Sequence, residues 1–534
     1  MTSIFNKIVA AIKNLTQGRL ADEVSVDNNA FFSTMSNQSW VRAIQLWRKH
    51  SDDILQQLPL RPCPACGEND SRLIHTSYDA HPFHVCKNCL CWFEPYLIDE
   101  NVFQKLFSLS PEAEKLAQEM AQERLDIGYE NDSKRFRELL LILPFFGKGT
   151  LLDIGANAGQ FVKQARKDGW NAWGLEKDVF ALQQARENKL PVIADFNELP
   201  NKKWDAITLW ETIEHVADPL ALLSFAKSML ADNGIMAFTF PNRNNFQLQQ
   251  MRGDSPHAHG GYNTPGHINF FGKSQFEKLL SRVGMRAIYW DGFYASDYSL
   301  QWSYLHGSVD NLAEQSELFT VEFPALLLKF TESLNLLERK TLTSPILLCL
   351  ACRADARLKA VAPKIDKLHT ARQAQLDLWE QALLRSTQPL PFTVQFAVNS
   401  PGAYKVMICA DNISSVDVGI LIHKIDLRNE NGKIVWQGMN DLLLHTHDFY
   451  SKSKKINDSC VILFANNVRY DYLLNSSHLH LPAGQYTLSL EGYSTIGRAA
   501  VGIIDVATGA WFVPSCAIPY NFDPSEVYKA CLEK

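Results

Sequence analysis

The sequence contains no apolar run long enough to cross a bilayer as a helix, which takes about 20 residues. The nearest candidate, residues 344–352, is far too short. Residues 1–15 also lack the continuous apolar core and the small-residue cleavage site of a secretory signal. We therefore expect no transmembrane segment and a cytoplasmic location. The apolar residues of 1–15 follow a helical face, which predicts an amphipathic helix on the protein's own surface or, alternatively, at a membrane surface.

The chain has no large excess of charge of either sign. Its 52 Lys and Arg against 58 Asp and Glu give a formal net charge of −6. This balance argues against a general nucleic-acid-binding surface, so we expect no nucleic-acid partner. A hydrophobic content of 46% is usual for a globular protein, and 534 residues are too many for one core, which indicates three or four domains.

Disulfide bonding is not favoured, because the cysteine total of 11 is odd and no secretory signal is apparent. Four cysteines form two Cys-x-x-Cys pairs, Cys63 with Cys66 and Cys86 with Cys89. Each pair lets two thiolates reach one ion from a tight turn, so the spacing predicts a closed, structural zinc site. Cys91 and three intervening histidines are substitute ligands in principle, but four thiolates already complete such a site.

A glycine-containing turn follows the first strongly apolar strand. The apolar run ends at Asp153, is interrupted by Gly155 and Gly159, and resumes at helical spacing. This pattern predicts a buried parallel strand, a tight turn and the first helix of a βαβ unit. Glycine suits such a turn because a Cβ would keep the backbone from closing on a ligand, and the helix offers unpaired N–H groups.

Acidic residues follow the next predicted strands. The pattern predicts strands at residues 171–176, 191–194, 204–210 and 234–242. Glu176 ends the first of these, about twenty residues after the turn, where a nucleotide-binding fold places the acid that holds the ribose hydroxyls. Asp195 and Glu211 follow the next two. Since such sheets bind ligands at the carboxyl ends of their strands, these side chains are expected at one site.

The segments so far described resemble the class I S-adenosylmethionine-dependent methyltransferases. The matching stretches are residues 153–159, Glu176, Asp195, 211–219, 240–242 and a segment at 267–280 that matches a recurrent helix of the family. The resemblance covers roughly residues 130–355 and implies a doubly wound, Rossmann-like, seven-stranded α/β core that binds S-adenosylmethionine. In one departure, Asn157 stands where the family has the middle of three glycines. Asn tolerates positive φ, so the turn can still form.

The resemblance also implies a set of site residues. The expected cofactor-binding residues are Asp153, Gly155, Ala156, Asn157, Gly159, Glu176, Asp195, Phe196 and Trp210. A sulfonium methyl is already activated, so the enzyme aligns a nucleophile and manages one proton. His215 and His267 are candidate proton acceptors because imidazole titrates near neutral pH, and Glu211 is a candidate acid in the pocket. A helix-capping role is the alternative for His215.

The remaining chain divides by composition. We expect a helical N-terminal segment (1–58), a zinc ribbon (59–98), a helical connector or lid (99–147), the methyltransferase domain (148–355) with a helical insertion (298–342), a helical linker (356–388) and an all-β sandwich (389–534). Short alternating strands separated by turn signals predict the sandwich. Its aromatic residues Trp436, Trp511, Tyr486 and Tyr493 are candidates for stacking on sugar rings or for the core.

Two functions are consistent with this pattern. The first is a methyltransferase that O-methylates a small molecule, a glycan or a glycan precursor, with a homodimer as one candidate assembly. The second is a non-catalytic scaffold built on a degenerate methyltransferase core. The zinc ribbon resembles the small zinc module found ahead of some bacterial methyltransferase domains, which supports both the zinc site and the methyltransferase domain.

Overall fold

The computed structural model describes most of the folded elements of the chain. The described residues are 38–76, 82–97, 100–116, 119, 149–200, 203–245, 267–293, 333, 336–356, 362–384, 390–410, 418–441, 443–444, 451–457, 460–465, 472–494, 499–508 and 511–517. The helix expected in residues 1–15, most of the connector and most of the helical insertion lie outside them. In the described part of the chain, no helix is both long and apolar enough to cross a membrane.

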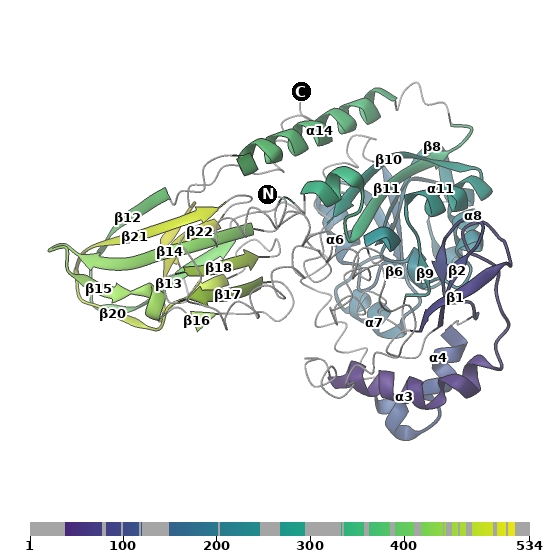
Figure 1. Ribbon diagram of the computed structural model, residues 1–534, viewed down its shortest axis with the longest axis horizontal. Coiled ribbons are helices and arrows are strands. Elements are labelled where there is room, and N and C mark those ends of the chain that lie inside the picture. The colour runs from purple at the N-terminus through teal and green to yellow at the C-terminus, as the bar shows by residue number, and fades with distance from the viewer. Residues whose placement is uncertain are drawn as a thin grey trace, which may run out of the picture.

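The central element is a seven-stranded sheet with the order β10-β11-β8-β7-β4-β5-β6. Its strands β8, β10 and β11 are labelled in Figure 1. Its strands are β4 (Thr150–Ile154), β5 (Asn171–Leu175), β6 (Val192–Ile193), β7 (Trp204–Trp210), β8 (Leu230–Pro241), β10 (Met285–Phe293) and β11 (Ile346–Arg353). The strands from β4 to β8 pair in parallel, and β11 runs antiparallel to both β8 and β10. The predicted doubly wound, Rossmann-like core is confirmed.

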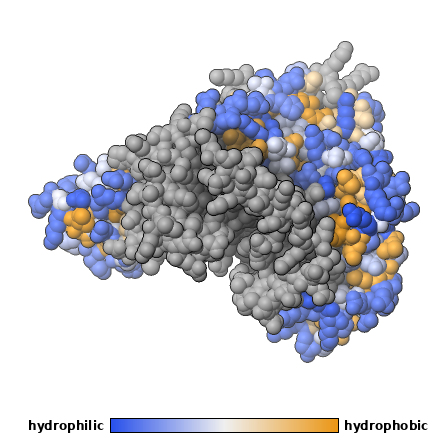
Figure 2. All heavy atoms as spheres, in the orientation of Figure 1, coloured by the Kyte–Doolittle hydropathy of each residue, from blue (hydrophilic) through white to orange (hydrophobic). Residues whose placement is uncertain are grey.

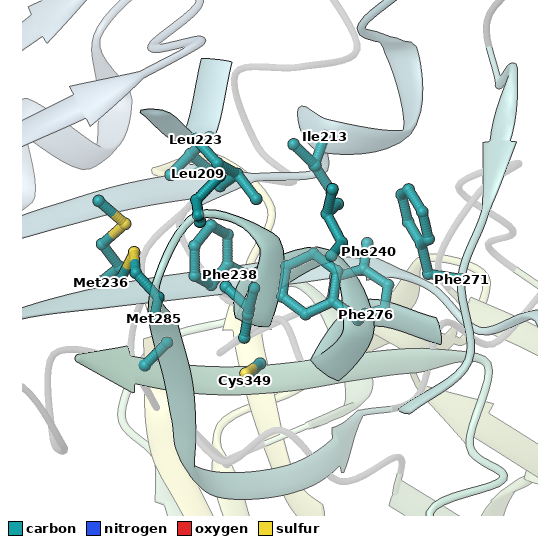
Figure 3. Packing of buried hydrophobic residues seen from close by; sticks show 14 of the residues in the cluster. Leu209, Ile213, Leu223, Met236, Phe238, Phe240, Phe271, Phe276, Met285 and Cys349 are labelled. Atoms are coloured by element: carbon teal, nitrogen blue, oxygen red, sulfur yellow. The ribbon is translucent and has the colours of Figure 1, made fainter. Parts of the chain in front are cut away.

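Helices cover both faces of this sheet because its strands are apolar on both sides. They are α6 (Gln160–Lys167), α7 (Val179–Glu187), α8 (Pro219–Met229) and α11 (Lys273–Arg282). Leu151 and Leu152, successive residues of β4, are fully buried in separate hydrophobic clusters. In the cluster on the α8 and α11 side, Phe238 and Phe240 of β8 pack around Phe276 of α11 (Figure 3).

The N-terminal part forms a second, smaller sheet that includes a strand from far along the chain. Its order is β1 (Ser71–Thr76), β2 (Pro82–Cys86), β3 (Trp92–Phe93) and β9 (Asn269–Phe270). In the β3–β9 pair, Trp92 lies opposite Phe270. The segment 267–280 was expected to match a helix, but it begins as strand β9, and α11 starts only at Lys273. Helices α3 (Gln38–Leu55) and α4 (Glu100–Phe107) pack together beside this sheet.

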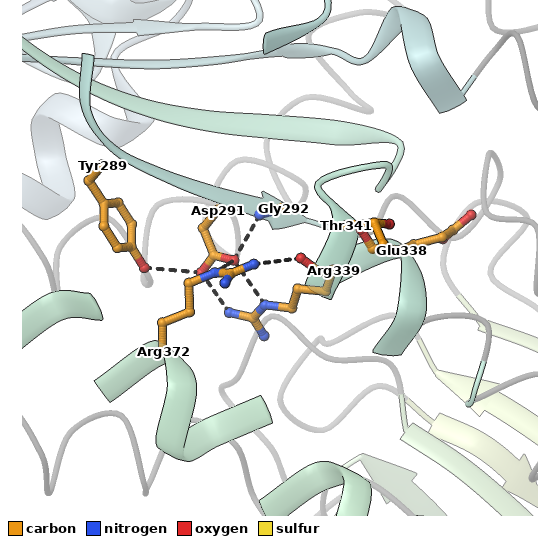
Figure 4. Close-up of polar contacts among 7 residues, drawn as sticks. All are labelled: Tyr289, Asp291, Gly292, Glu338, Arg339, Thr341 and Arg372. Carbon is orange, nitrogen blue, oxygen red and sulfur yellow. Dashed lines mark hydrogen bonds and ion pairs between the residues drawn. The ribbon is translucent and has the colours of Figure 1, made fainter. Parts of the chain in front are cut away.

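A buried ion network attaches α14 (Ala362–Leu384), which lies in the predicted linker, to the edge strand β10. The Asp291 carboxylate accepts hydrogen bonds from Arg339 Nε at 3.1 Å and Nη2 at 2.9 Å, and from Arg372 Nε of α14 at 2.8 Å (Figure 4). Leu368 and Ala371 of α14 are buried in the core cluster on the same side. The helix is therefore packed against the core domain as well as leading to the C-terminal sheets.

The C-terminal region contains two antiparallel sheets of six strands each. One consists of β12 (Leu390–Val398), β21 (Gly484–Ser494), β14 (Val418–Asn429), β18 (Cys460–Ala465), β17 (Ser451–Asn457) and β15 (Ile434–Gln437). The other consists of β16 (Leu443–Leu444), β19 (Tyr472–Asn475), β13 (Gly402–Ala410), β22 (Ala499–Asp505), β23 (Trp511–Ala517) and β20 (Leu479–Leu481). Ile425 of the first and Val406 of the second are buried in one cluster, so the predicted sandwich is confirmed. In the view of Figure 2 its described surface is mainly hydrophilic.

Candidate cofactor and acceptor site

The turn between β4 and α6 has the backbone conformation that its glycines require. Gly155 and Gly159 have φ values of +78° and +82°, and Asn157 has a φ of +48°. The Asn157 side chain adds a local hydrogen bond, since its Oδ1 accepts from the Ala158 N–H at 2.8 Å. Asn157 therefore keeps the left-handed turn that a glycine would form there.

Packing also requires glycine at the first turn position. A Cβ placed on Gly155 would lie 2.5 Å from Thr212 Oγ1, and one on Gly159 would lie 2.7 Å from Val192 Cγ2. Thr212 follows β7, and its Oγ1 donates to the Ile154 carbonyl at 3.2 Å. The turn is therefore packed tightly against the loop after β7. The sequence argument explained the glycines by close approach of a ligand and did not predict this contact within the protein.

Glu176 lies at the end of β5 beside this turn. Its Oε2 accepts from the Asn157 N–H at 2.8 Å, and its Oε1 accepts from the N–H groups of Lys177 and Asp178 at 2.6 and 2.9 Å. A carboxylate has about four acceptor positions, so these three bonds fix the group and leave an acceptor position on Oε2 for a ligand hydroxyl. Its placement fits the expected contact with a ribose.

The other expected cofactor residues have structural contacts of their own. Asp153 is buried between β4 and β7, where it accepts from Thr208 Oγ1 at 2.6 Å. Asp195 caps a short 3-10 helix (Phe196–Glu198) by accepting from the Asn197 N–H at 2.9 Å. Phe196 itself is 50% exposed. Ala156 is buried, and Trp210 at the end of β7 packs edge-on against Phe161 of α6, with ring centroids 5.4 Å apart.

The candidate proton acceptors lie together beside the β7 loop. His215 ends a short 3-10 helix (Ile213–His215), and its ring centroid is 4.7 Å from that of His267. Glu214, which the sequence argument did not select, is fully buried between them: its Oε1 is 3.9 Å from His215 Nε2 and 4.0 Å from His267 Nε2. The sequence did place Glu214 next to the candidate His215, but it did not indicate that the Glu214 side chain is buried. Glu211 has a φ of +43° and is not part of this cluster.

Two side chains hold this cluster in position. Buried Asn269 donates from Nδ2 to the carbonyl oxygens of Ile213 at 3.1 Å and Val216 at 2.8 Å. Arg61 donates to the carbonyl oxygens of Ala217 at 2.9 Å and Ile268 at 2.7 Å. Helix α8 is capped by Asp218, whose Oδ1 accepts from the Ala221 N–H at 2.9 Å.

The four predicted zinc ligands converge. Cys63 Sγ is 3.5 Å from Cys89 Sγ, Cys66 Sγ is 3.5 Å from Cys86 Sγ, and all four sulfur atoms lie within 4.8 Å of one another. Four thiolates at this distance need a cation to compensate their charge, so the donor set fits zinc. Cys91 is buried outside the group.

Two of the four sandwich aromatics proposed as sugar contacts belong to the core. Trp436 is buried and donates from Nε1 to Asp441 at 2.6 Å. Tyr486 is buried, stacks on Phe396 with ring centroids 5.7 Å apart, and donates its hydroxyl to the Pro482 carbonyl at 2.9 Å. Neither ring is placed to stack on a sugar. The side chains of Trp511 and Tyr493 lie outside the described residues, as does the loop 257–266 before His267.

Comparisons with known proteins identify relatives of part of this chain. Among curated proteins, the chain is similar to the Ubiquinone biosynthesis O-methyltransferase of Actinobacillus pleuropneumoniae serotype 7, with 30% identity over 112 residues, which are 18% of this chain and 47% of that protein. It is 27% identical over 178 residues to the enzyme of that name from Dinoroseobacter shibae, covering 31% of this chain and 71% of that protein. The chain spans about half the length of the first curated relatives it matches.

Among solved structures, the chain is similar to a SAM dependent methyltransferase from Archaeoglobus fulgidus, with 18% identity and a TM-score of 0.29 over 42% of this chain and 93% of that one. Residues 118–289 match the family model of a methyltransferase domain. This segment contains the glycine turn, Glu176, Asp195 and the cluster of Glu214, His215 and His267. This chain therefore contains a domain of the methyltransferase family, as its sequence resemblance implied.

Proposed function

We propose that the protein transfers the methyl group of S-adenosylmethionine to an oxygen atom of a small molecule, a glycan or a glycan precursor. The hydrogen bond from the Asn157 N–H to Glu176 carries the proposal, because it fixes a carboxylate acceptor beside a left-handed turn at the carboxyl ends of β4 and β5. Polar ligands bind at that edge in open α/β sheets. Curated relatives named O-methyltransferases favour oxygen as the acceptor atom.

The residues after β7 would manage the proton of the acceptor. When bound, S-adenosylmethionine supplies a methyl group that is activated by its positively charged sulfur. As the new oxygen–carbon bond forms and the carbon–sulfur bond breaks, the acceptor hydroxyl loses one proton. The cluster of Glu214, His215 and His267 would take up that proton, because an imidazole can accept a proton near neutral pH and the Glu214 carboxylate lies 3.9 and 4.0 Å from the Nε2 atoms of the two rings. Thr212 lies against Gly155 and directly precedes the short helix of Glu214 and His215, which supports a position of the proton acceptors near the turn.

Titration of the full-length protein with S-adenosylmethionine by calorimetry tests the donor site. Glu176→Ala should weaken binding by about 1–3 kcal/mol, because charge-assisted hydrogen bonds are lost. Glu187→Ala, at the exposed end of α7, is the matched control and should bind like wild type. A wild-type protein that binds no S-adenosylmethionine would favour the scaffold alternative. Methylated products trapped from a lysate supplied with the labelled cofactor would then identify the acceptor.

A further inference from the structure

Two arginine side chains lie on opposite faces of β3, the strand that follows the second cysteine pair. The Arg243 guanidinium lies over the Trp92 ring, with its Cζ 5.2 Å from the ring centroid. The Arg61 guanidinium lies over the Phe93 ring at 5.7 Å. Since successive residues of a strand face opposite sides, the two cations enclose β3 between them. Trp92 and Phe93 are accordingly buried in separate hydrophobic clusters.

The first of these arginines comes from the core domain. Arg243 follows the end of β8 by two residues, is buried, and donates its backbone N–H to the Phe271 carbonyl at 3.0 Å. Burial lowers the pKa of its side chain, and charges on Cys91 and Cys89 oppose this shift. Negative charge on these sulfur atoms therefore favours the guanidinium cation at this place. The core domain thus brings one positive charge to the four-cysteine cluster.

The second arginine belongs to the ribbon itself. Arg61 precedes Cys63 by two residues, and its three side-chain nitrogens each donate to a backbone carbonyl oxygen. Burial lowers the pKa of Arg61 to about 10, and charges on Glu94, Cys91 and Cys63 are among those that oppose the shift. The hydrogen bonds fix the guanidinium beside the first cysteine pair, whereas Arg243 acts on a ligand of the second pair.

The charge of the metal centre matches that of these two side chains. A zinc ion bound by four thiolates retains two net negative charges. Cys63, Cys86 and Cys89 are buried in a hydrophobic cluster, where a charge is costly unless an opposite charge accompanies it. Two guanidinium groups supply the same amount of positive charge. We propose that Arg61 and Arg243 are the counter-charges of the zinc centre and determine how tightly the protein holds the ion.

The counter-charges connect the metal centre to the core domain. Arg243 lies just beyond the carboxyl end of β8, on the edge where open α/β sheets bind ligands. A coupling between two binding events or contacts is reciprocal, so the two partners stabilise each other by the same free energy. Arg243 strengthens zinc binding, and the zinc-loaded ribbon in return holds the backbone after β8 in place.

The zinc affinity of the full-length protein, measured by competition with a chromophoric chelator, tests the proposal. Changing a group that supports a metal ligand costs about 10- to 100-fold in affinity, and we expect a loss in that range for Arg243→Met. Arg243→Lys keeps the charge and should retain most of the affinity. Arg243→Gln is a second uncharged variant, in case the Met variant does not fold. Arg72→Met, at an exposed arginine of β1 in the same ribbon, is the matched control and should bind zinc like wild type.

The absorption of cobalt(II) bound by the four cysteines separates charge from packing. Its charge-transfer band arises when an electron moves from a thiolate to the metal, and a nearby cation opposes this movement because it stabilises the thiolate electrons. Arg243→Met should therefore shift the band to lower energy, and Arg243→Lys should leave it near its wild-type position. Wild-type zinc affinity in Arg243→Met would overturn the proposal. Equal losses in the Met and Lys variants with an unshifted band would also overturn it, because packing alone would then explain them.

Discussion

Arg61 donates from Nη2 to the carbonyl oxygen of Ile268 at 2.7 Å, which joins the start of the zinc ribbon to the residue after His267. Its Nη1 and Nε bind the carbonyl oxygens of Ala217 and Glu94. One side chain thus connects three segments, two of which flank the proposed acceptor site. The ribbon is in consequence part of the support of that site.

Replacement of Arg61 should affect both stability and the acceptor side. Burial lowers the pKa of Arg61 to about 10, with Glu94 opposing the shift, so the guanidinium still carries its charge at neutral pH. Arg61→Met removes three hydrogen bonds and should lower the free energy of unfolding by about 2–4 kcal/mol in urea denaturation. Arg72→Met, on an exposed part of β1, should change it by less than about 0.5 kcal/mol. An equal loss in both variants would contradict the role given to Arg61.

Loss of zinc should destabilise more than the ribbon. Cys63, Cys86 and Cys89 are buried in the same hydrophobic cluster as Leu152 of β4, and Gln275 of α11 donates to the Cys89 carbonyl at 2.7 Å. In Cys86→Ser we expect no bound zinc by elemental analysis and a lower melting temperature for the core domain in calorimetry. Zinc-free wild-type protein, or a core transition unchanged in the variant, would show that the cluster has no such role.

Gly155 and Thr212 should be energetically coupled. Gly155→Ala places a methyl group 2.5 Å from Thr212 Oγ1 and also strains a φ of +78°. We expect a loss of stability above about 1 kcal/mol and weaker S-adenosylmethionine binding. In the Thr212→Ala background the clash is relieved, but the φ strain remains. The loss of stability caused by Gly155→Ala should therefore be smaller in that background, but not zero. A double-mutant cycle measures this coupling, and additive effects would mean that the two residues do not touch.

The Asp291 network predicts a stability change in acid. Burial alone raises the pKa of Asp291, but Arg339 and Arg372 outweigh burial and lower it from 3.8 to about 2. Because the folded-state pKa is depressed, the stabilisation of about 2 kcal/mol is fully present above the ordinary pKa and is lost as the pH falls from 3.8 toward 2. The difference in unfolding free energy between wild type and Asp291→Asn should therefore stay constant from about pH 7 to 5 and narrow below about pH 4. A difference that does not vary with pH would refute the shifted pKa.

Strong apolar patterns predicted the core domain well. The strand predicted at residues 204–210 has those bounds in β7, because a run buried on both faces ends at polar residues. The cysteine pairs were equally informative, since two tight turns bring the four sulfur atoms together. Such signals are local: each depends on a few neighbouring residues.

What the sequence did not predict depends on distant partners. Strand β9 has two residues, too few for any periodicity, and it pairs with β3, whose Trp92 lies opposite Phe270. Strand β17 lacks the alternating apolar residues from which the sandwich was predicted, because it carries Lys452, Lys454 and Lys455, as suits an edge strand. The burial of Glu214 likewise comes from the fold around it.

The pairing of β3 with β9 has a consequence for biosynthesis. Trp92 and Phe270 are separated by about 180 residues, so the small sheet cannot be completed until the ribosome has made most of the core domain. At about 5–20 residues per second, this separation corresponds to a delay of roughly 10–35 s. During that interval Trp92 lacks the strand that lies beside it in the folded protein, and Gln275 cannot yet donate to the Cys89 carbonyl. The four-cysteine cluster, whose members lie within residues 63–89, can in contrast form before the small sheet is complete.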